Sequence, residues 1–299
     1  MAISKKEPDI KEIRPVLIAY PSIYSLLMLN YWVAKRKIKF AGIILSQSHI
    51  TMKGIKFSFL ESFYILCKKS GLSYALYMFF IIKGSILVIT VWNFITRLKG
   101  EPLRLKTFNR IAKEAHIPLL KAKNINSLQA VNLMKAVGAN VIVSGYNNQI
   151  LRYRICKEFA LRGINIHNAY LPDFGGLDAA FETIYEEVAK SGATIHYIDK
   201  GVDTGRIISQ ERIAVKPDDT VFSLNIHQWL KGAELLPAVF KIIAEGEVET
   251  KKQDSSQVKY PYRSFPDKKR VKEIIKRGRR IILLRDILRP NPYVCQIFK

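Results

Sequence analysis

Short runs of almost continuously apolar residues constrain this chain most, because such runs form strands buried on both faces of a parallel sheet. The clearest runs lie at residues 15–20 (PVLIAY), 40–46 (FAGIILS) and 140–144 (NVIVS). Further strand-like segments lie at 118–121, 163–167, 193–198 and 206–209, and helix-like stretches at 23–34, 108–115, 128–137, 152–161 and 178–189. Strands that alternate with helices predict one α/β domain over residues 14–246, doubly wound around a mostly parallel sheet.

Composition excludes several other classes of protein. With 48% hydrophobic and 24% charged residues, the chain of 299 residues has the composition of a folded protein. Its three cysteines, Cys67, Cys156 and Cys295, are far apart in sequence, which argues against a disulfide scaffold and a zinc ribbon. Residues 1–10 are polar and charged rather than typical of a secretory signal. We expect a cytoplasmic protein without a metal, with a membrane-peripheral location as the alternative.

Positive charge is concentrated at the end of the chain. The formal net charge is +23, made up of a segment at 164–250 with net −7 and basic segments on both sides, including a C-terminal extension at 251–299 with net +11. A basic extension of this kind binds RNA or an anionic membrane, or it is an amphipathic helix whose charges are solvated. The sequence leaves both interpretations open.

An apolar stretch interrupts the α/β pattern within residues 51–105, which we interpret as a helical insertion. Residues 75–95 approach the length of a membrane-spanning helix, but Lys83 lies near their centre, where a lysine is costly in a bilayer. We therefore predict two helices broken at Gly84 and buried against the domain or in a homodimer. Helices lying in the membrane interface are the second interpretation and a true span the third.

Polar residues with catalytic potential cluster around residues 163–205. Asn165 and His167 are two positions apart at a predicted strand end, so their side chains lie on the same face of the sheet. Asp203 lies at a predicted corner between Gly201 and Gly205, which permit a sharp turn. These three types of side chain can together stabilise an oxyanion and move a proton.

The segment resembles the formyltransferase family that uses 10-formyltetrahydrofolate, which includes glycinamide ribonucleotide transformylase, methionyl-tRNA formyltransferase and formyltetrahydrofolate hydrolase. The resemblance covers residues 130–246 well and 14–50 loosely. The residues that carry it are Asn165, His167, Leu171, Pro172, Gly175, Gly176, Thr194, His196, Asp203 and Gly205. It implies a Rossmann-like formyltransferase domain that moves a formyl group from 10-formyltetrahydrofolate to the amine of an unidentified acceptor.

The resemblance also implies roles for particular residues. Asn165 and His167 would donate hydrogen bonds to the tetrahedral oxyanion, and Asp203 would hold the imidazole and relay a proton. The folate would lie against a loop and a turn, whose residues are Tyr146, Asn148, Gln149, Ile150 and Leu151 in the loop and Lys200, Gly201 and Val202 in the turn. We interpret His196 as mid-strand and structural.

Three departures from the family pattern bear on the acceptor. Asn168 stands where the family has Pro or a small residue, Asp178 stands where many members carry other groups, and residues 19–22 lack a glycine-rich phosphate cradle. The last departure argues against glycinamide ribonucleotide. Two alternatives stay open: a formyltetrahydrofolate hydrolase with water as acceptor, and a non-catalytic module that binds membrane or RNA.

Overall fold

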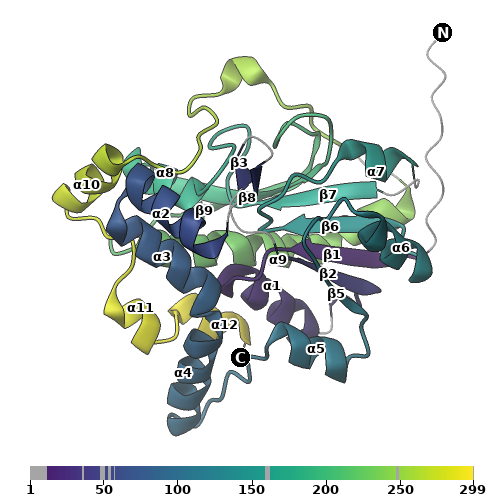
Figure 1. The fold of residues 1–299 in the computed structure, drawn as a ribbon, viewed down its shortest axis with the longest axis horizontal. Helices are drawn as coiled ribbons and strands as arrows, with labels where there is room; N and C mark the ends of the chain where they lie inside the picture. The colour runs from purple at the N-terminus through teal and green to yellow at the C-terminus, as the bar shows by residue number, and fades with distance from the viewer. Residues whose placement is uncertain are drawn as a thin grey trace.

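A seven-stranded sheet forms the centre of the computed structural model, which describes residues 12–298 apart from 36, 48–50, 53–54, 57, 159–161 and 247–248 (Figure 1). The strand order is β5-β2-β1-β6-β7-β8-β9. Five strands run parallel, and β8 and β9 are antiparallel to their neighbours. The strands are β1 (Pro15–Ala19), β2 (Gly42–Ser46), β5 (Leu119–Ala122), β6 (Val141–Gly145), β7 (Arg162–His167), β8 (Lys190–Tyr197) and β9 (Ile207–Ala214). A separate hairpin joins β3 (Thr51–Met52) and β4 (Ile55–Lys56).

Helices cover both faces of the sheet, as the doubly wound prediction requires (Figure 1). Alternate residues of β1 show this, because Leu17 belongs to the core formed with α1 (Ile23–Ala34), α5 (Phe108–Glu114) and α9 (Val221–Glu245). Its neighbour Val16 belongs to the core formed with α6 (Leu128–Ala136) and α7 (Tyr153–Glu158). The Trp32 indole fixes α1 to α9 by donating to the carbonyl of Ala233 at 2.9 Å. The predicted fold class is confirmed.

Two predicted helices differ from the structure. The helix predicted at 152–161 begins at Tyr153 and is described to Glu158, and residues 159–161 lie outside the described part of the chain. The helix predicted at 178–189 is α8 (Ala179–Tyr185), which begins after the N-cap Asp178 and ends early, where Glu186 is the C-cap and Glu187 has a left-handed conformation with φ of 53°. One acidic residue of this helix, Glu182, is buried.

The insertion forms α2 (Phe59–Ser70), α3 (Leu72–Lys83) and α4 (Ser85–Leu98). The predicted break is confirmed: α3 and α4 meet at Gly84 with a bend of 70°, and a Cβ at Gly84 would lie 2.7 Å from the Phe80 carbonyl oxygen. No single described helix is long and apolar enough to cross a bilayer, although this bent pair meets the length and composition criteria. Burial is one-sided: Tyr77 and Trp92 are in the core, whereas Leu76 and Phe94 are exposed.

The basic C-terminal extension packs against the α/β domain. It contains a short 3-10 turn (Ser255–Gln257), α10 (Lys268–Lys276), α11 (Leu284–Leu288) and α12 (Pro292–Phe298). Ile274 and Ile281 are buried in the same core as α1 and α9. The carbonyl of Ile281 also accepts a hydrogen bond of 2.9 Å from the Phe222 N–H at the start of α9. Packing of the extension through its apolar residues therefore agrees with the amphipathic interpretation.

Arg270 links the extension to α8. Its guanidinium donates to both carboxylate oxygens of Glu182, at 2.7 and 2.5 Å, and lies 4.0 Å from the centre of the Tyr185 ring. Burial raises the pKa of Glu182, and the hydrogen bonds from Arg270 oppose this shift. The stability of the fold with a charged Glu182 therefore depends on Arg270, because a buried charge without a partner is costly.

We expect Arg270→Met to lower the free energy of unfolding by about 3–5 kcal/mol, because it leaves the Glu182 charge buried without its main partner. The measurement is the midpoint of urea-induced unfolding. Arg277→Met is the matched control: Arg277 pairs with Glu273 on the surface of the same helix, so its loss should shift the midpoint far less. The double variant Glu182→Met/Arg270→Met should recover stability relative to Arg270→Met alone. Equal midpoints for Arg270→Met and the wild type would contradict this account.

Candidate active site

Three residues that the sequence singled out come together at the end of β7. Asn165 and His167 project from the same face of β7, and Asp203 approaches them from the connection between β8 and β9. One carboxylate oxygen of Asp203, Oδ1, lies 3.5 Å from Asn165 Nδ2 and 3.7 Å from His167 Nδ1. These long separations leave both nitrogens free of a short hydrogen bond to the carboxylate.

His196 orients the amide of Asn165. The two residues face each other across the antiparallel pair β7–β8, and Asn165 Nδ2 lies 3.1 Å from His196 Nε2. The other ring nitrogen, Nδ1, lies 2.8 Å from the Tyr197 carbonyl, so it carries the proton and Nε2 accepts from the amide. Burial lowers the pKa of His196, although the nearby Asp203 carboxylate opposes this. His196 thus stays neutral and fixes which atom of the amide points into the site. It lies next to the end of β8 rather than mid-strand.

His167 has one ring nitrogen engaged and one available. Its Nε2 lies 3.0 Å from the Phe174 carbonyl, which accepts only, so Nε2 carries a proton. In the neutral ring Nδ1 is then without a proton, and it is the nitrogen that faces Asp203. A proton taken up at Nδ1 would therefore form an ion pair with that carboxylate.

The backbone around Asp203 holds its side chain in place. Asp203 has a left-handed conformation, with φ of 57°, and its second oxygen accepts from the Gly176 N–H at 2.9 Å. Gly205 is required nearby, because a Cβ there would lie 1.7 Å from the Tyr197 carbonyl oxygen. Gln253, from the C-terminal extension, donates to the carbonyls of Asp203 and Gly205 at 2.8 and 2.7 Å. No local sequence pattern pointed to Gln253.

A cavity of about 410 Å³ joins these residues to the predicted folate subsite. Seven of the eight predicted folate residues line it: Tyr146, Asn148, Gln149, Ile150, Leu151, Gly201 and Val202. Lys200 does not line it and is exposed. Asn148 and Gln149 were expected to offer polar groups, yet each hydrogen-bonds to the Ser46 hydroxyl, at 2.8 and 2.7 Å, and so shapes the loop.

One polar atom in this loop is buried without a partner. Asn147 Nδ2 donates to the Gln149 carbonyl at 2.9 Å, whereas Asn147 Oδ1 has no hydrogen-bond partner among the described residues. Buried acceptors of this kind are rare because desolvation is costly unless a ligand or water satisfies them. Asn147 lines the cavity, so its Oδ1 is positioned to accept from a bound molecule.

Aromatic residues and the carboxylate of Asp178 form a further part of the cavity lining, which we call the aromatic wall. Asp178 caps α8 and accepts from the Tyr74 hydroxyl at 2.5 Å and from Asn225 Nδ2 at 3.0 Å. Its burial raises its pKa, and these hydrogen bonds oppose the shift. Tyr24 and Tyr77 share a hydrogen bond of 2.8 Å beside it. Sequence reasoning noted Asp178 but missed the tyrosines, because they come from α1 and α3, which are far apart in sequence.

Comparison with known proteins points to one family. A formyl transferase family model matches residues 96–240. Among curated proteins, methionyl-tRNA formyltransferase of Kosmotoga olearia is 28% identical over 162 residues, covering 54% of this chain and 52% of that protein. The corresponding protein of Syntrophomonas wolfei is 31% identical over 171 residues, covering 56% and 54%. The chain thus spans about half the length of the curated relatives it matches.

Solved structures agree on the fold. Phosphoribosylglycinamide formyltransferase from Anaplasma phagocytophilum superposes with a TM-score of 0.53 at 17% identity, covering 85% of this chain and 100% of that one. Glycinamide ribonucleotide transformylase 1 from Symbiobacterium toebii superposes with a TM-score of 0.52 at 19% identity, covering 82% of this chain and 95% of that one. The match of residues 96–240 to the formyl transferase model, the relatives and this shared fold all support the resemblance to the formyltransferase family found in the sequence.

Proposed function

We propose that this protein is an N-formyltransferase that moves the formyl group of 10-formyltetrahydrofolate to an amine. The observation that carries the proposal is the set of three polar side chains, Asn165, His167 and Asp203, at one end of a cavity with an aromatic wall. In this set the amide is oriented and one imidazole nitrogen is available. Such a site suits acyl transfer, in which an oxyanion develops and protons leave the attacking amine.

Asn165 is assigned to the oxyanion. The bound donor supplies an electrophilic formyl carbon, and the attack of the amine places negative charge on the formyl oxygen. The Asn165 amide donates through Nδ2, whose orientation is set by His196. A donor fixed before the reaction stabilises this charge without reorganisation, which is often the largest contribution to catalysis.

His167 and Asp203 are assigned to the proton. Nδ1 of His167 accepts a proton from the attacking amine and returns one to the departing nitrogen of the folate. Oδ1 of Asp203 lies 3.7 Å from this Nδ1, and its carboxylate stabilises the imidazolium that exists between the two proton transfers. With Nε2 held by the Phe174 carbonyl, the ring cannot rotate to offer the other nitrogen.

The folate is assigned to the side of the cavity lined by residues 146–151. The unpaired Asn147 Oδ1 supports this assignment, because the pterin ring carries N–H donors. Ile150 and Leu151 offer apolar contacts beside it.

The acceptor is assigned to the aromatic wall near Asp178. At the first strand end, a phosphate-bearing acceptor would need free N–H groups at the start of α1. There the capping box of Ser22 and Ser25 already occupies the N–H groups of these two residues. The apolar and tyrosine surface of the cavity instead favours an amine attached to an apolar or aromatic group.

We expect Asn165→Ala and His167→Ala each to lower the rate of 10-formyltetrahydrofolate consumption by about a hundred- to a thousandfold. The assay follows the donor spectroscopically with a panel of amines, and mass spectrometry identifies the formylated product. Asn132→Ala, an exposed substitution on α6, is the control and should keep full activity. Full turnover by either active-site variant would show that the roles are wrongly assigned. Formate release at an equal rate without any amine would identify water as the acceptor.

His196 should act by positioning Asn165. We expect His196→Phe to lower kcat about tenfold with little change in KM, which corresponds to the loss of one orienting hydrogen bond. Wild-type activity should also fall at acid pH, at a pH below the ordinary histidine value, because protonated Nε2 can no longer accept from the amide. The variant should lack this acid limb, whereas an unchanged pH profile would contradict the positioning role.

The same pKa shift has a consequence for stability. The pKa of His196 is lower in the folded chain than in the unfolded one, so the unfolded chain binds the proton more readily. Stability should therefore decline as pH falls below about 6.5, the unfolded value. The difference between wild type and His196→Phe in urea unfolding should shrink over that range.

A further inference from the structure

The outer sides of α2, α3 and α4 expose apolar residues in rows that run into basic residues. We call these rows the apolar face. It consists of Leu60, Tyr64 and Lys68 on α2, Leu72, Leu76, Phe79 and Lys83 on α3, and Ile86, Leu87, Phe94 and Leu98 on α4, followed by Lys99. Within each row the residues are mostly three or four positions apart, so they lie on one side of their helix.

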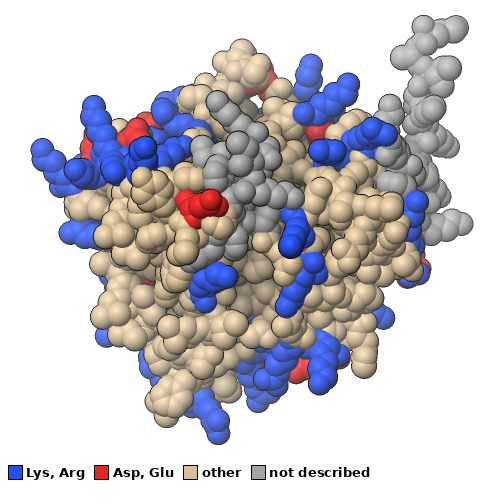
Figure 2. Space-filling view, in the orientation of Figure 1, with Lys and Arg blue, Asp and Glu red and all other residues tan. Residues whose placement is uncertain are grey.

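The fold does not need these residues to be apolar. The inner sides of the helices already provide the contacts with the core, through residues such as Tyr77 and Trp92. Leu87, Phe94 and Leu98 are 58%, 61% and 72% exposed, so polar residues would serve the fold equally well. In Figure 2 the region where Figure 1 places α2–α4 is largely without charged side chains. Soluble proteins rarely keep a large exposed apolar region without a partner.

Charge indicates the chemistry of that partner. Residues 62–99 contain five basic residues, Lys68, Lys69, Lys83, Arg97 and Lys99, and no acidic residue. Apolar side chains edged by cations match a surface that is apolar inside and anionic at its rim. An anionic lipid bilayer has this structure.

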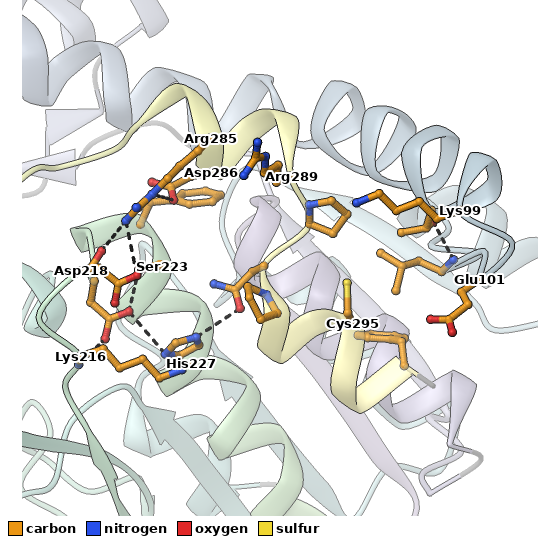
Figure 3. Close-up of a pocket in the computed structure, with 18 of the residues that line it drawn as sticks. Lys99, Glu101, Lys216, Asp218, Ser223, His227, Arg285, Asp286, Arg289 and Cys295 are labelled. Carbon is orange, nitrogen blue, oxygen red and sulfur yellow. Dashed lines mark hydrogen bonds and ion pairs between the residues drawn. The ribbon is translucent and has the colours of Figure 1, made fainter.

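A second cavity, of about 830 Å³, lies where α4 ends, on the inner side of this helix and therefore away from the apolar face (Figure 3). Its cations are Lys99, Arg104, Lys216, Arg285 and Arg289. Its acidic residues are Glu101, Asp218, Asp219 and Asp286, and Arg285 lies 3.8 Å from Asp218 and 3.9 Å from Asp286. Much of the positive charge in this cavity is therefore balanced within the protein. Helix α11 packs on α4, where the Trp92 indole donates a hydrogen bond to the Ile287 carbonyl. Leu284 and Leu288 of α11 are exposed.

We propose that the apolar face docks on an anionic lipid bilayer, with the exposed basic residues at its edges, Lys68, Lys83 and Lys99, facing the lipid phosphates. The helices lie on the bilayer rather than cross it, because their inner sides are packed against the α/β core. Phe79 belongs to the apolar face and also lines the active-site cavity, so docking brings the entrance of that cavity close to the lipid surface.

Co-sedimentation of the full chain with vesicles tests the proposal. Phosphatidylcholine vesicles that contain phosphatidylglycerol should bind the wild type, vesicles of phosphatidylcholine alone should bind it less, and high salt should weaken binding. The variant Leu87→Ser/Phe94→Ser/Leu98→Ser should bind about tenfold more weakly or worse, because three inserted apolar side chains are lost. The charge variant Lys83→Glu/Arg97→Glu should lose the preference for phosphatidylglycerol.

Matched controls show that the effect is local. Leu128→Ser removes an equally exposed leucine, 73% exposed, from α6 on the far side of the sheet and should bind vesicles as the wild type does. None of the substituted residues lines the active-site cavity, so all variants should keep the basal consumption of 10-formyltetrahydrofolate and the thermal unfolding of the wild type. Because the vesicle assay needs no turnover, its result is independent of the proposed function.

Two outcomes would overturn the proposal. One is a wild type that stays in the supernatant with phosphatidylglycerol vesicles at low salt, or a triple variant that binds as well as the wild type. The other is a stable dimer in sedimentation without lipid that the triple variant converts to monomer, which would make a second copy of the chain the partner of this face.

Discussion

The active site depends on how one carboxylate, that of Asp203, is held. Three nitrogens approach its Oδ1, from Asn165, His167 and His196, at 3.5 to 3.8 Å. None is close enough to fix the carboxylate, so the backbone must do so through the left-handed turn and the Gly176 N–H. This arrangement holds the Asp203 carboxylate beside Nδ1 of His167 without a short contact between them. It also leaves the amide and the imidazole free to contact a substrate.

The C-terminal extension completes that support, although charge alone suggested a separate segment. Gln253 bridges the turn of Asp203, and Arg263 exchanges hydrogen bonds with the loop at Gly175 and Leu177. The Tyr260 ring stacks on Phe174, whose carbonyl holds His167. The extension is therefore part of the scaffold of the candidate site, and cutting the chain near residue 250 would remove contacts that position His167.

Features that depend on local patterns and short spacings could be predicted from the sequence. The apolar runs gave the strands, the i and i+2 spacing placed Asn165 beside His167, and Gly84 marked the break between α3 and α4. It could not predict contacts between distant segments. Arg270 belongs to a run of charges that would ordinarily be solvated, and only the fold brings it to Glu182. Likewise, α3 is apolar nearly all round, so its sequence could not show which side faces the core.

Asp178 illustrates how a buried carboxylate near a reaction centre can be structural. All of its hydrogen-bond donors come from the protein, namely the Tyr74 hydroxyl, the Asn225 amide and the Phe181 N–H. These bonds take up both oxygens, so Asp178 has little capacity left to accept a proton from a substrate amine. Asn225 in turn accepts from Asn168, the residue after His167, at 2.9 Å. The network therefore fixes the aromatic wall relative to His167, the residue to which we assign the proton in the proposed reaction.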